Sequence, residues 1–206
     1  MRKPNFSFER KYWNKGIKLV AGLDEVGRGA WAGPVVAASV IFPPDVRLRV
    51  KLNDSKKLTS KVREELAEVI KQRALFWSVG QVGNQDIDRG GIKSATEKAM
   101  ERALNGVDSR PGFILVDFFS VSFWPKNQQL PIKFGDNLSN SIAAASILAK
   151  VARDNLMRKL SAEYPHYDFS SNKGYGTKIH QAAIREFGLC PLHRTTFVPE
   201  GLFNGN

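Results

Sequence analysis

Short apolar runs and helix-spaced apolar positions alternate along the chain. Residues 19–23 and 34–42 are rich in Val, Ile and Ala and are bounded by Gly and Pro, which predicts two strands joined by a glycine-rich turn. Because the link is short, we expect these strands to pair antiparallel. Residues 74–82 predict a third strand, the continuous apolar run 112–117 predicts a strand buried on both faces, and 130–134 predicts one more.

Apolar residues three or four positions apart predict four helices. Capping residues and glycines mark their ends, and the stretch between 139 and 161 begins with small residues that permit close packing. The helices and the apolar residues expected to face the core are: Thr59 or Ser60 to about Arg73 (Val62, Leu66, Val69, Ile70); 92–104 (Ile92, Ala95, Ala99, Ala103); 139 to about 161 (Ile142, Ala145, Ala149, Ala152, Leu156); and the segment from the turn 173–177 to Gly188 (Ile179, Ala183, Phe187).

These elements predict a single α/β domain, with strands first and helices accumulating toward the C-terminus. We expect residues 17–206 to form that domain and residues 1–16, which are basic and aromatic, to form an arm that docks on it. No apolar run approaches the roughly 18 residues of a membrane span, and the N-terminus lacks the apolar stretch of a signal peptide. With Cys190 as its single cysteine, the chain has no internal disulfide, so we expect a cytoplasmic monomer without a membrane partner.

The charge is strongly basic. The chain has 31 Lys and Arg against 20 Asp and Glu, a formal net charge of +11. Such an excess favours a polyanionic partner, because Lys and Arg bind phosphates with release of counterions. Lysine also serves solubility alone, so the charge by itself leaves the partner open.

Acidic residues follow the apolar strands at three places. They are the pair Asp24 and Glu25, then Asp117, then Asp136 just before the long helix. Carboxylates brought together repel one another unless a divalent cation lies between them, and a set of oxygen ligands without a His or Cys group selects Mg²⁺ or Mn²⁺. Strand alternation sends Asp24 and Glu25 to opposite faces, so we expect the strand to end or bulge at this pair.

Simpler interpretations of the acids compete with a metal site. An aspartate after a strand is usually a turn former or a helix cap, and an adjacent Asp-Glu pair is usually a solvated edge. The glycines around the pair and the basic charge elsewhere favour a catalytic role of these acids over the simpler roles. The pattern therefore predicts, at most, a metal-dependent phosphoryl-transfer site.

Five segments, in order, resemble the type 2 ribonuclease H family, ribonuclease HII. Each is short, but the set spans residues 22 to 197 and is specific as a set. The segments are Gly22-Leu23-Asp24-Glu25-Val26-Gly27-Arg28-Gly29 with Ala32 to Ala38; Leu52 to Leu58; Gly135-Asp136 with Ala144 to Asp154; Lys173-Gly174-Tyr175-Gly176-Thr177; and His193-Arg194-Thr195-Thr196-Phe197.

The resemblance implies a ribonuclease H-like fold, a mixed central β-sheet flanked by helices, with additional C-terminal helices. It implies that Asp24, Glu25, Asp117 and Asp136 are the catalytic acids and hold Mg²⁺ or Mn²⁺. The implied activity is cleavage of the RNA strand of an RNA:DNA hybrid, and of duplex DNA at single embedded ribonucleotides, leaving 3′-hydroxyl and 5′-phosphate ends. In a two-metal site, one ion lowers the pKa of the attacking water and the other stabilises the leaving oxygen.

The resemblance also implies substrate-binding residues. In the family the Gly-Arg-Gly turn, here Gly27, Arg28 and Gly29, supplies backbone groups to the ribose 2′-hydroxyl, the group that distinguishes RNA from DNA. The implied sugar-packing residue is Tyr175. Candidate phosphate-binding residues are Lys56 and Lys57, and further Lys173, Lys178 and Arg194.

One segment departs from the family pattern. The third acid is usually followed by glycine, whereas Asp117 is followed by Phe118 and Phe119. The departure bears on the local backbone and on the floor of the groove, but not on the acid itself. Asp154 lies in a matching segment, and we expect it to be a supporting or surface acid and not a ligand.

Two other functions stay open at this point. One is a different nuclease of the same fold superfamily, such as a resolvase or an integrase-like protein, which would cut without regard to a single 2′-hydroxyl. The other is a basic nucleic-acid-binding module without catalysis, which would bind whether or not a chelator is present. A cleavage assay on ribose-substituted duplexes separates the three.

Overall fold

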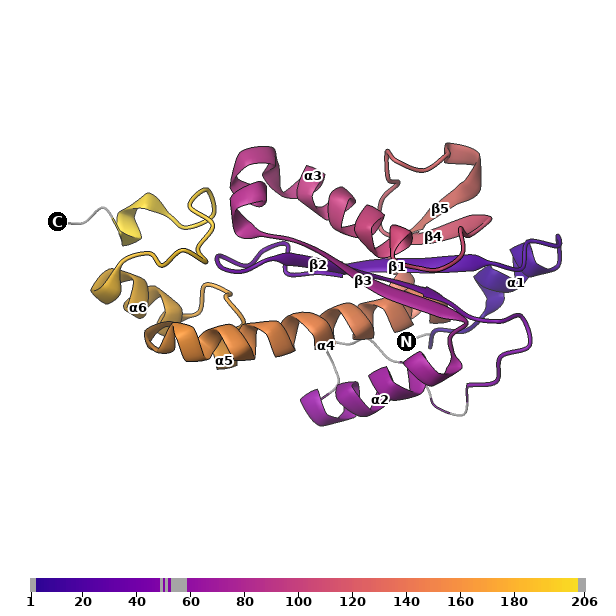
Figure 1. Cartoon of the computed structure of the whole chain (residues 1–206), viewed down its shortest axis with the longest axis horizontal. Coiled ribbons are helices and arrows are strands. Elements are labelled where there is room, and N and C mark those ends of the chain that lie inside the picture. Colours follow the sequence, from indigo (N-terminus) through magenta and orange to yellow (C-terminus); the bar gives the residue numbers. More distant parts are fainter. Residues whose placement is uncertain (1–2, 49, 51, 53–58, 204–206) are drawn as a thin grey trace.

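The computed structural model describes residues 3–48, 50, 52 and 59–203. These residues form a five-stranded sheet with the strand order β3-β2-β1-β4-β5 (Figure 1). Strands β1, β2 and β3 pair antiparallel, and β4 and β5 run parallel to β1, so the sheet is mixed as predicted. The strands are β1 Val20–Val26, β2 Val35–Ile41, β3 Phe76–Val82, β4 Phe113–Asp117 and β5 Gln129–Ile132.

Helices cover both faces of the sheet. Figure 1 shows α3 on one face and α4 with α2 on the other, while α5 and α6 extend from the far end of α4. This layered α/β arrangement with extra C-terminal helices confirms the predicted fold class. The helices are α1 Ser7–Trp13, α2 Ser60–Arg73, α3 Asn84–Asn105, α4 Asn140–Glu163, α5 Phe169–Asn172 and α6 Lys178–Phe187.

Helix α4 lies close against β1 because both carry small residues where they cross. A Cβ on Gly22 would lie 2.2 Å from the carbonyl carbon of Ser141, so only glycine fits there. Ser139 caps the helix, and its hydroxyl accepts a hydrogen bond from the Ile142 amide at 3.2 Å. This close crossing sets the position of α4 relative to the end of β1, where two of the predicted acids lie.

The N-terminal segment docks on the sheet layer through α1. Phe6 packs edge-on against Phe42 with ring centroids 5.5 Å apart. The buried Glu9 carboxylate accepts hydrogen bonds from the Ser139 hydroxyl at 2.7 Å and the Ser141 amide at 2.9 Å, at the start of α4. The segment therefore helps to fix the helix that crosses β1. That residues 17–206 form a domain without it stays a prediction.

The bounds of most elements match the predictions, but three helix faces do not. In α2, Val62 is 39% exposed and Arg63 is buried in its place. In α6, Ile179 is 63% exposed and Phe187 is also exposed, while His180 and Ile184 are buried. In α4, Ala152 and Leu156 are only partly buried, while Arg153, Asp154 and Met157 are buried. Among the bounds, α3 differs: it begins at Asn84, before the predicted residue 92, and has a break at Gly91.

The same cause explains all three errors. Hydrophobicity predicts the buried face only when the buried side chains are apolar. Here buried Arg, Asp and His side chains have hydrogen-bond partners inside the protein, which offsets the cost of removing them from water.

Among the described helices, none combines the length and the apolar character needed to cross a membrane.

Candidate active site

The parallel strands β1 and β4 end their pairing at the predicted acids. Their register pairs Leu23 with Val116, so Asp24 and Asp117 are the next residues along the two strands. Parallel strands bring residues of equal register to the same edge of a sheet. The apolar run before each acid is buried, which fixes both strands and leaves the two carboxylates beside each other where the pairing of β1 with β4 stops.

The turn that carries Asp136 is tied to the same place. The Gly135 amide donates a hydrogen bond to the Asp117 Oδ1 atom at 2.7 Å. Asp136 follows immediately in a short 3₁₀ turn, is buried, and accepts a hydrogen bond from the Asn137 side-chain amide at 2.8 Å. Asp136 therefore reaches the cavity from the turn before α4, as its position before the long helix predicted.

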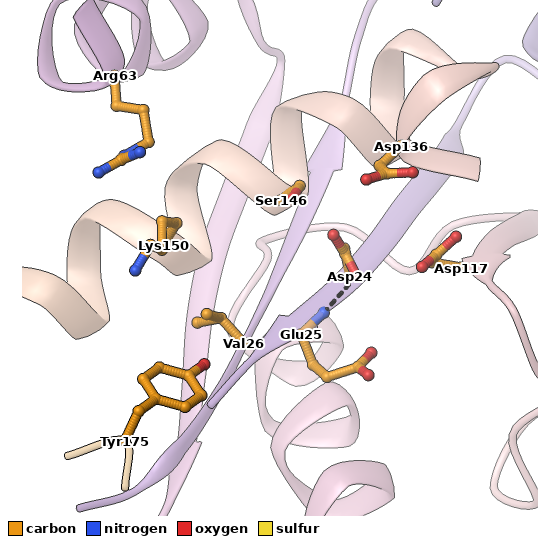
Figure 2. Close-up of a pocket in the computed structure, with 9 residues that line it drawn as sticks. All are labelled: Asp24, Glu25, Val26, Arg63, Asp117, Asp136, Ser146, Lys150 and Tyr175. Atoms are coloured by element: carbon orange, nitrogen blue, oxygen red, sulfur yellow. Dashed lines mark hydrogen bonds between the residues drawn. The ribbon is translucent and has the colours of Figure 1, made fainter. Parts of the chain in front are cut away.

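Glu25 reaches the cavity differently from the prediction. The expected end or bulge of the strand at this pair is wrong, since β1 pairs with β2 in unbroken register through Val26. Because β4 stops at Asp117, the edge of β1 on that side is open beyond Leu23. The Glu25 side chain starts from the opposite face and still lines the cavity, on the Asp117 side in Figure 2.

Burial and repulsion between carboxylates disfavour the charged forms of Asp24 and Glu25. The pKa of Asp24 is raised well above its usual value by burial first, and then by the charges of Glu25 and Asp117, against a lowering hydrogen bond from Ser146. Burial also raises the pKa of Glu25, although the Arg28 guanidinium, 3.2 Å from Oε1, opposes this. The other oxygen, Glu25 Oε2, is buried without a hydrogen-bond partner among the described residues.

The four acids surround one cavity of about 510 Å³. In Figure 2 the carboxylates of Asp24, Asp117 and Asp136 face the space between them. Within the described part of the chain, no three His, Cys, Asp or Glu side chains are arranged so that they could hold a metal ion as they stand. The structure thus brings the predicted acids to one cavity, but as they stand their carboxylates do not surround a common metal position. The cavity is lined by Asp24, Glu25, Val26, Arg63, Asp117, Asp136, Ser146, Lys150 and Tyr175.

Arg153 joins the two turns that the sequence assigned to substrate binding. Its guanidinium donates to the carbonyls of Pro34 at 2.9 Å, Lys173 at 2.8 Å and Ala32 at 3.1 Å. It also lies 5.5 Å from the centre of the Tyr175 ring. Tyr175 lines the cavity, so one buried cation fixes the tyrosine turn against the loop that follows the Gly-Arg-Gly segment.

Arg194 holds the Gly-Arg-Gly turn through a hydrogen bond to its backbone. It is fully buried and donates to the carbonyls of Gly33 and Arg28, both at 2.9 Å. Burial lowers its pKa to about 10. The prediction that Arg194 binds phosphate is therefore wrong for this conformation, because its side chain is inside the protein. Lys56 and Lys57 lie outside the described residues.

The glycines of the turn have different reasons to be glycine. Gly27 has a φ of +90°, and a Cβ there would lie 2.2 Å from Arg153 Nε, so the fold itself requires glycine. Gly29 is exposed, and a Cβ there would meet nothing within 4 Å. Arg28 lies between them, exposed, with its guanidinium 5.4 Å from the centre of the Phe119 ring.

The sequence predictions give no role to three polar residues that line the cavity: Arg63, Ser146 and Lys150. The last two lie four residues apart in α4, on the same side of the helix, inside a segment that was recognised without a role. Asp154, four residues further on, continues that row and is buried, in agreement with a supporting role. The periodic spacing of these polar residues was the available signal.

The backbone conformation of the residue after Asp117 accounts for the glycine that the ribonuclease HII family usually has at this position. Phe118 has a φ of +67°, in the left-handed region where glycine carries no penalty. Its side chain is 59% exposed and its amide donates to the Ile132 carbonyl at 3.0 Å. The chain therefore keeps the backbone turn that glycine favours, and the acid before it stays in place.

Solved structures with this arrangement are ribonucleases of the H type. The ribonuclease H2 from Pyrococcus horikoshii superposes with a TM-score of 0.72 at 28% identity, over 86% of this chain and 93% of that chain. The ribonuclease HII in a PCNA complex from Archaeoglobus fulgidus superposes with a TM-score of 0.72 at 27% identity, over 88% and 96%. The molecule thus has the ribonuclease H-like fold.

Sequence comparison identifies the family within that class. The family model described as Ribonuclease HII matches residues 21–199. The ribonuclease HII of Caldanaerobacter subterraneus subsp. tengcongensis is 49% identical over 191 residues, which cover 93% of this chain and 78% of that protein. The chain belongs to the ribonuclease HII family and is a hydrolase, an endoribonuclease that acts on the RNA of RNA:DNA hybrids.

Proposed function

We propose that this ribonuclease cleaves at the cavity bounded by Asp24, Glu25, Asp117 and Asp136, and that it also cuts duplex DNA at single embedded ribonucleotides, leaving 3′-hydroxyl and 5′-phosphate ends. The observation that carries the proposal is the gathering of four acids in one cavity, where burial and the neighbouring carboxylates raise the pKa of Asp24 and which Tyr175 also lines. Such a concentration of like charge costs stability and is typical of functional sites.

The donor set fits hard divalent cations. All four side chains offer carboxylate oxygens, Glu25 Oε2 is buried without a partner among the described residues, and burial with mutual repulsion raises the pKa of Asp24. Mg²⁺ or Mn²⁺ would be held by these four side chains after rotation about their side-chain bonds. When bound, two such ions would activate the attacking water and stabilise the leaving 3′-oxygen.

The protein itself contributes position and selectivity. Gly29 has no internal need to be glycine, so a direct approach of the substrate backbone is the reason that we propose for it. A ribose 2′-hydroxyl held there by backbone groups would distinguish RNA from DNA at one nucleotide. Tyr175, fixed by Arg153, would pack against the neighbouring sugar.

The test uses two substrates, an RNA:DNA hybrid and a DNA duplex with one ribonucleotide, each with Mg²⁺, Mn²⁺ or a chelator. We expect cleavage of both with a metal and neither with the chelator. An all-DNA duplex should stay intact. Cleavage of the hybrid alone would contradict the extension to single ribonucleotides, and cleavage in the chelator would contradict the metal-dependent site.

A matched pair of variants tests the ribose contact. Gly29→Ala should lower cleavage at single ribonucleotides by about tenfold or more without changing the midpoint of thermal unfolding, since its Cβ meets no protein atom. Gly201→Ala, whose Cβ also meets nothing within 4 Å, should change neither. Equal activity of the two variants would contradict the assignment.

The proposal keeps the sequence-based expectation of a cytoplasmic monomer. Sedimentation of the purified protein and fractionation of cells would test the oligomeric state and the compartment.

A further inference from the structure

The N-terminal segment contains a buried carboxylate that the catalytic assignment does not use. The Glu9 side chain of α1 is fully buried, and burial raises its pKa, against lowering hydrogen bonds from Ser139 and Ser141. A carboxylate is costly inside a protein because it loses its hydration. Docking on the sheet layer requires only apolar contacts, such as that of Phe6 with Phe42, so the carboxylate indicates a further role.

Glu9 holds Ser139, the residue that caps α4. Its Oε1 atom accepts a hydrogen bond from the Ser139 hydroxyl at 2.7 Å. The backbone of the same segment binds the two neighbours of Ser139. The Asn5 amide donates to the Leu138 carbonyl at 3.2 Å, and the Asn5 carbonyl accepts from the Asn140 amide at 3.0 Å. The N-terminal segment therefore fixes Ser139 through its side chain and on both sides of its backbone.

Ser139 in turn closes the turn that carries Asp136. The Ser139 amide donates to the Gly135 carbonyl at 2.8 Å, and the Leu138 amide donates to the same oxygen at 2.9 Å. The Gly135 amide is bound to the Asp117 carboxylate at 2.7 Å. The turn is thus held from two directions, by the end of β4 and by the N-terminal segment.

The Asp136 turn depends on such outside contacts for its conformation. It is a 3₁₀ turn of only three residues, which contributes little stability by itself. The residue before it, Phe134, has a φ of +58°, in the left-handed region that is unfavourable for phenylalanine. Contacts from the surrounding structure must offset this strain.

We propose that Glu9 is a positioning residue for Asp136, which it fixes through Ser139 in the orientation that the site requires. This rests on the proposed function, in which Asp136 helps to hold Mg²⁺ or Mn²⁺. Without the Glu9 carboxylate, the Ser139 hydroxyl and the Ser141 amide lose their acceptor, and the turn is held from the β4 side alone. The segment that the sequence predicts to be an arm thereby contributes to the active site.

Metal binding without substrate provides the first measurement. Mn²⁺ is titrated calorimetrically into the wild type, Glu9→Met and Glu9→Gln in the absence of nucleic acid. Methionine fills a similar volume but offers no carboxylate oxygen, so the Kd for Mn²⁺ should rise on the order of tenfold. Glutamine keeps an acceptor oxygen and should restore most of the affinity. Equal affinities of Glu9→Met and the wild type would overturn the proposal.

A control variant separates loss of position from loss of stability. Met100→Ala removes a buried side chain of α3, on the opposite face of the sheet from α4, and should also lower the midpoint of thermal unfolding. It should leave the Kd for Mn²⁺ unchanged. At temperatures where both variants are folded, Glu9→Met alone should need more metal for half-maximal cleavage, with the KM for the hybrid little changed. An equal rise of the Kd in both variants would overturn the positioning role.

A double variant tests the path through Ser139. Ser139→Ala removes the hydroxyl that binds Glu9, so it should raise the Kd for Mn²⁺ by itself. Glu9→Met should add little to that rise, because both changes break the same contact. Independent, multiplying effects would overturn the path through Ser139.

Hydrogen exchange in the metal-free protein separates this inference from the proposed function. The amides of Leu138 and Ser139, which close the Asp136 turn, should exchange faster in Glu9→Met than in the wild type, relative to the amides of β2. Failure of the wild type to bind Mn²⁺ or to cleave would count against the proposed function, and the exchange would still report on Glu9. Unchanged exchange of the two amides in Glu9→Met would overturn the inference.

Discussion

Two regions beside the cavity treat buried charge in opposite ways. Where the pairing of β1 with β4 stops, burial and the charges of Glu25 and Asp117 raise the pKa of Asp24, and burial and the charge of Asp117 raise the pKa of Glu25. Behind the substrate-binding turns, Arg153 and Arg194 are just as buried, but their guanidinium groups lie on backbone carbonyls. The acids are left in an unfavourable state, whereas most of the buried arginine donors are paired; Nη2 of Arg194 is an exception, buried without a hydrogen-bond partner among the described residues.

The difference separates chemistry from scaffolding. A buried charge with its hydrogen bonds satisfied rigidifies its surroundings and has little left to offer a ligand. A group of like charges whose repulsion is only partly offset stores a free energy that a cation or a developing charge can release. The acids should therefore control the rate of cleavage, and the arginines should control stability and the fit of the ribose.

The largest expected effect is on the acid region. Asp24→Asn should lower kcat by at least about a thousandfold, because a metal-binding carboxylate is lost. It should leave hybrid binding largely intact and raise the free energy of unfolding, since a buried charge and its repulsion disappear. Cleavage, binding and denaturant unfolding measure the three. Asp45→Asn, an exposed aspartate, is the control. Retained metal-dependent cleavage by the Asp24 variant would refute the site.

The arginine region should show the reverse. Arg153→Met leaves three carbonyls without their donor, two of them in buried contacts, so we expect the free energy of unfolding to fall by about 3 kcal/mol or more. At temperatures where the variant is folded, it should keep more of its activity on long hybrids than on single ribonucleotides. Arg158→Met removes an exposed cation of the same helix and should cost about 1 kcal/mol or less. Equal losses in the two variants would erase the contrast.

Sequence reasoning reached the acid region more fully than the arginine region. The apolar runs before Asp24 and Asp117 encode the sheet register, and the register alone brings these carboxylates together. Arg63 could not be placed, since its partner Asp154 is 91 positions away. The prediction that Arg194 binds phosphate fails because charge in a sequence does not distinguish a solvated cation from a buried one.

Two histidines next to the tyrosine turn are a further example of buried polar side chains with hydrogen-bond partners. His180 and His193 approach to 3.0 Å between their Nε2 atoms, and His180 Nδ1 lies 3.0 Å from the Tyr175 carbonyl. The Cys190 amide donates to His193 Nδ1, so the neutral ring presents an Nε2 proton to His180. Burial lowers the pKa of His193 from 6.5 to about 4.

This shift sets the sign of a pH effect. Between pH 6.5 and about 4 the unfolded chain binds a proton that the folded one refuses, so the stabilisation is complete above pH 6.5 and is lost as the pH falls. From pH 7 to pH 5 the wild type should lose about 2 kcal/mol that His193→Gln does not. Denaturant unfolding at both pH values measures this. Replacement of the exposed His166 by Gln should follow the wild type, and parallel pH curves for wild type and His193→Gln would contradict the role of burial.

The smallest expected effect concerns the backbone beside Asp117. Phe118 holds a left-handed conformation with more than half of its side chain exposed, so glycine should relieve strain at little cost in packing. Relief of this strain should raise the free energy of unfolding of Phe118→Gly. The gain should be only about 1 kcal/mol or less, because glycine also has more conformational freedom in the unfolded chain, which opposes it. Leu75→Gly, at an exposed position without positive φ, should lower it. If Phe118→Gly instead lowers both stability and cleavage, the phenylalanine contributes contacts to the acid region that outweigh its strain.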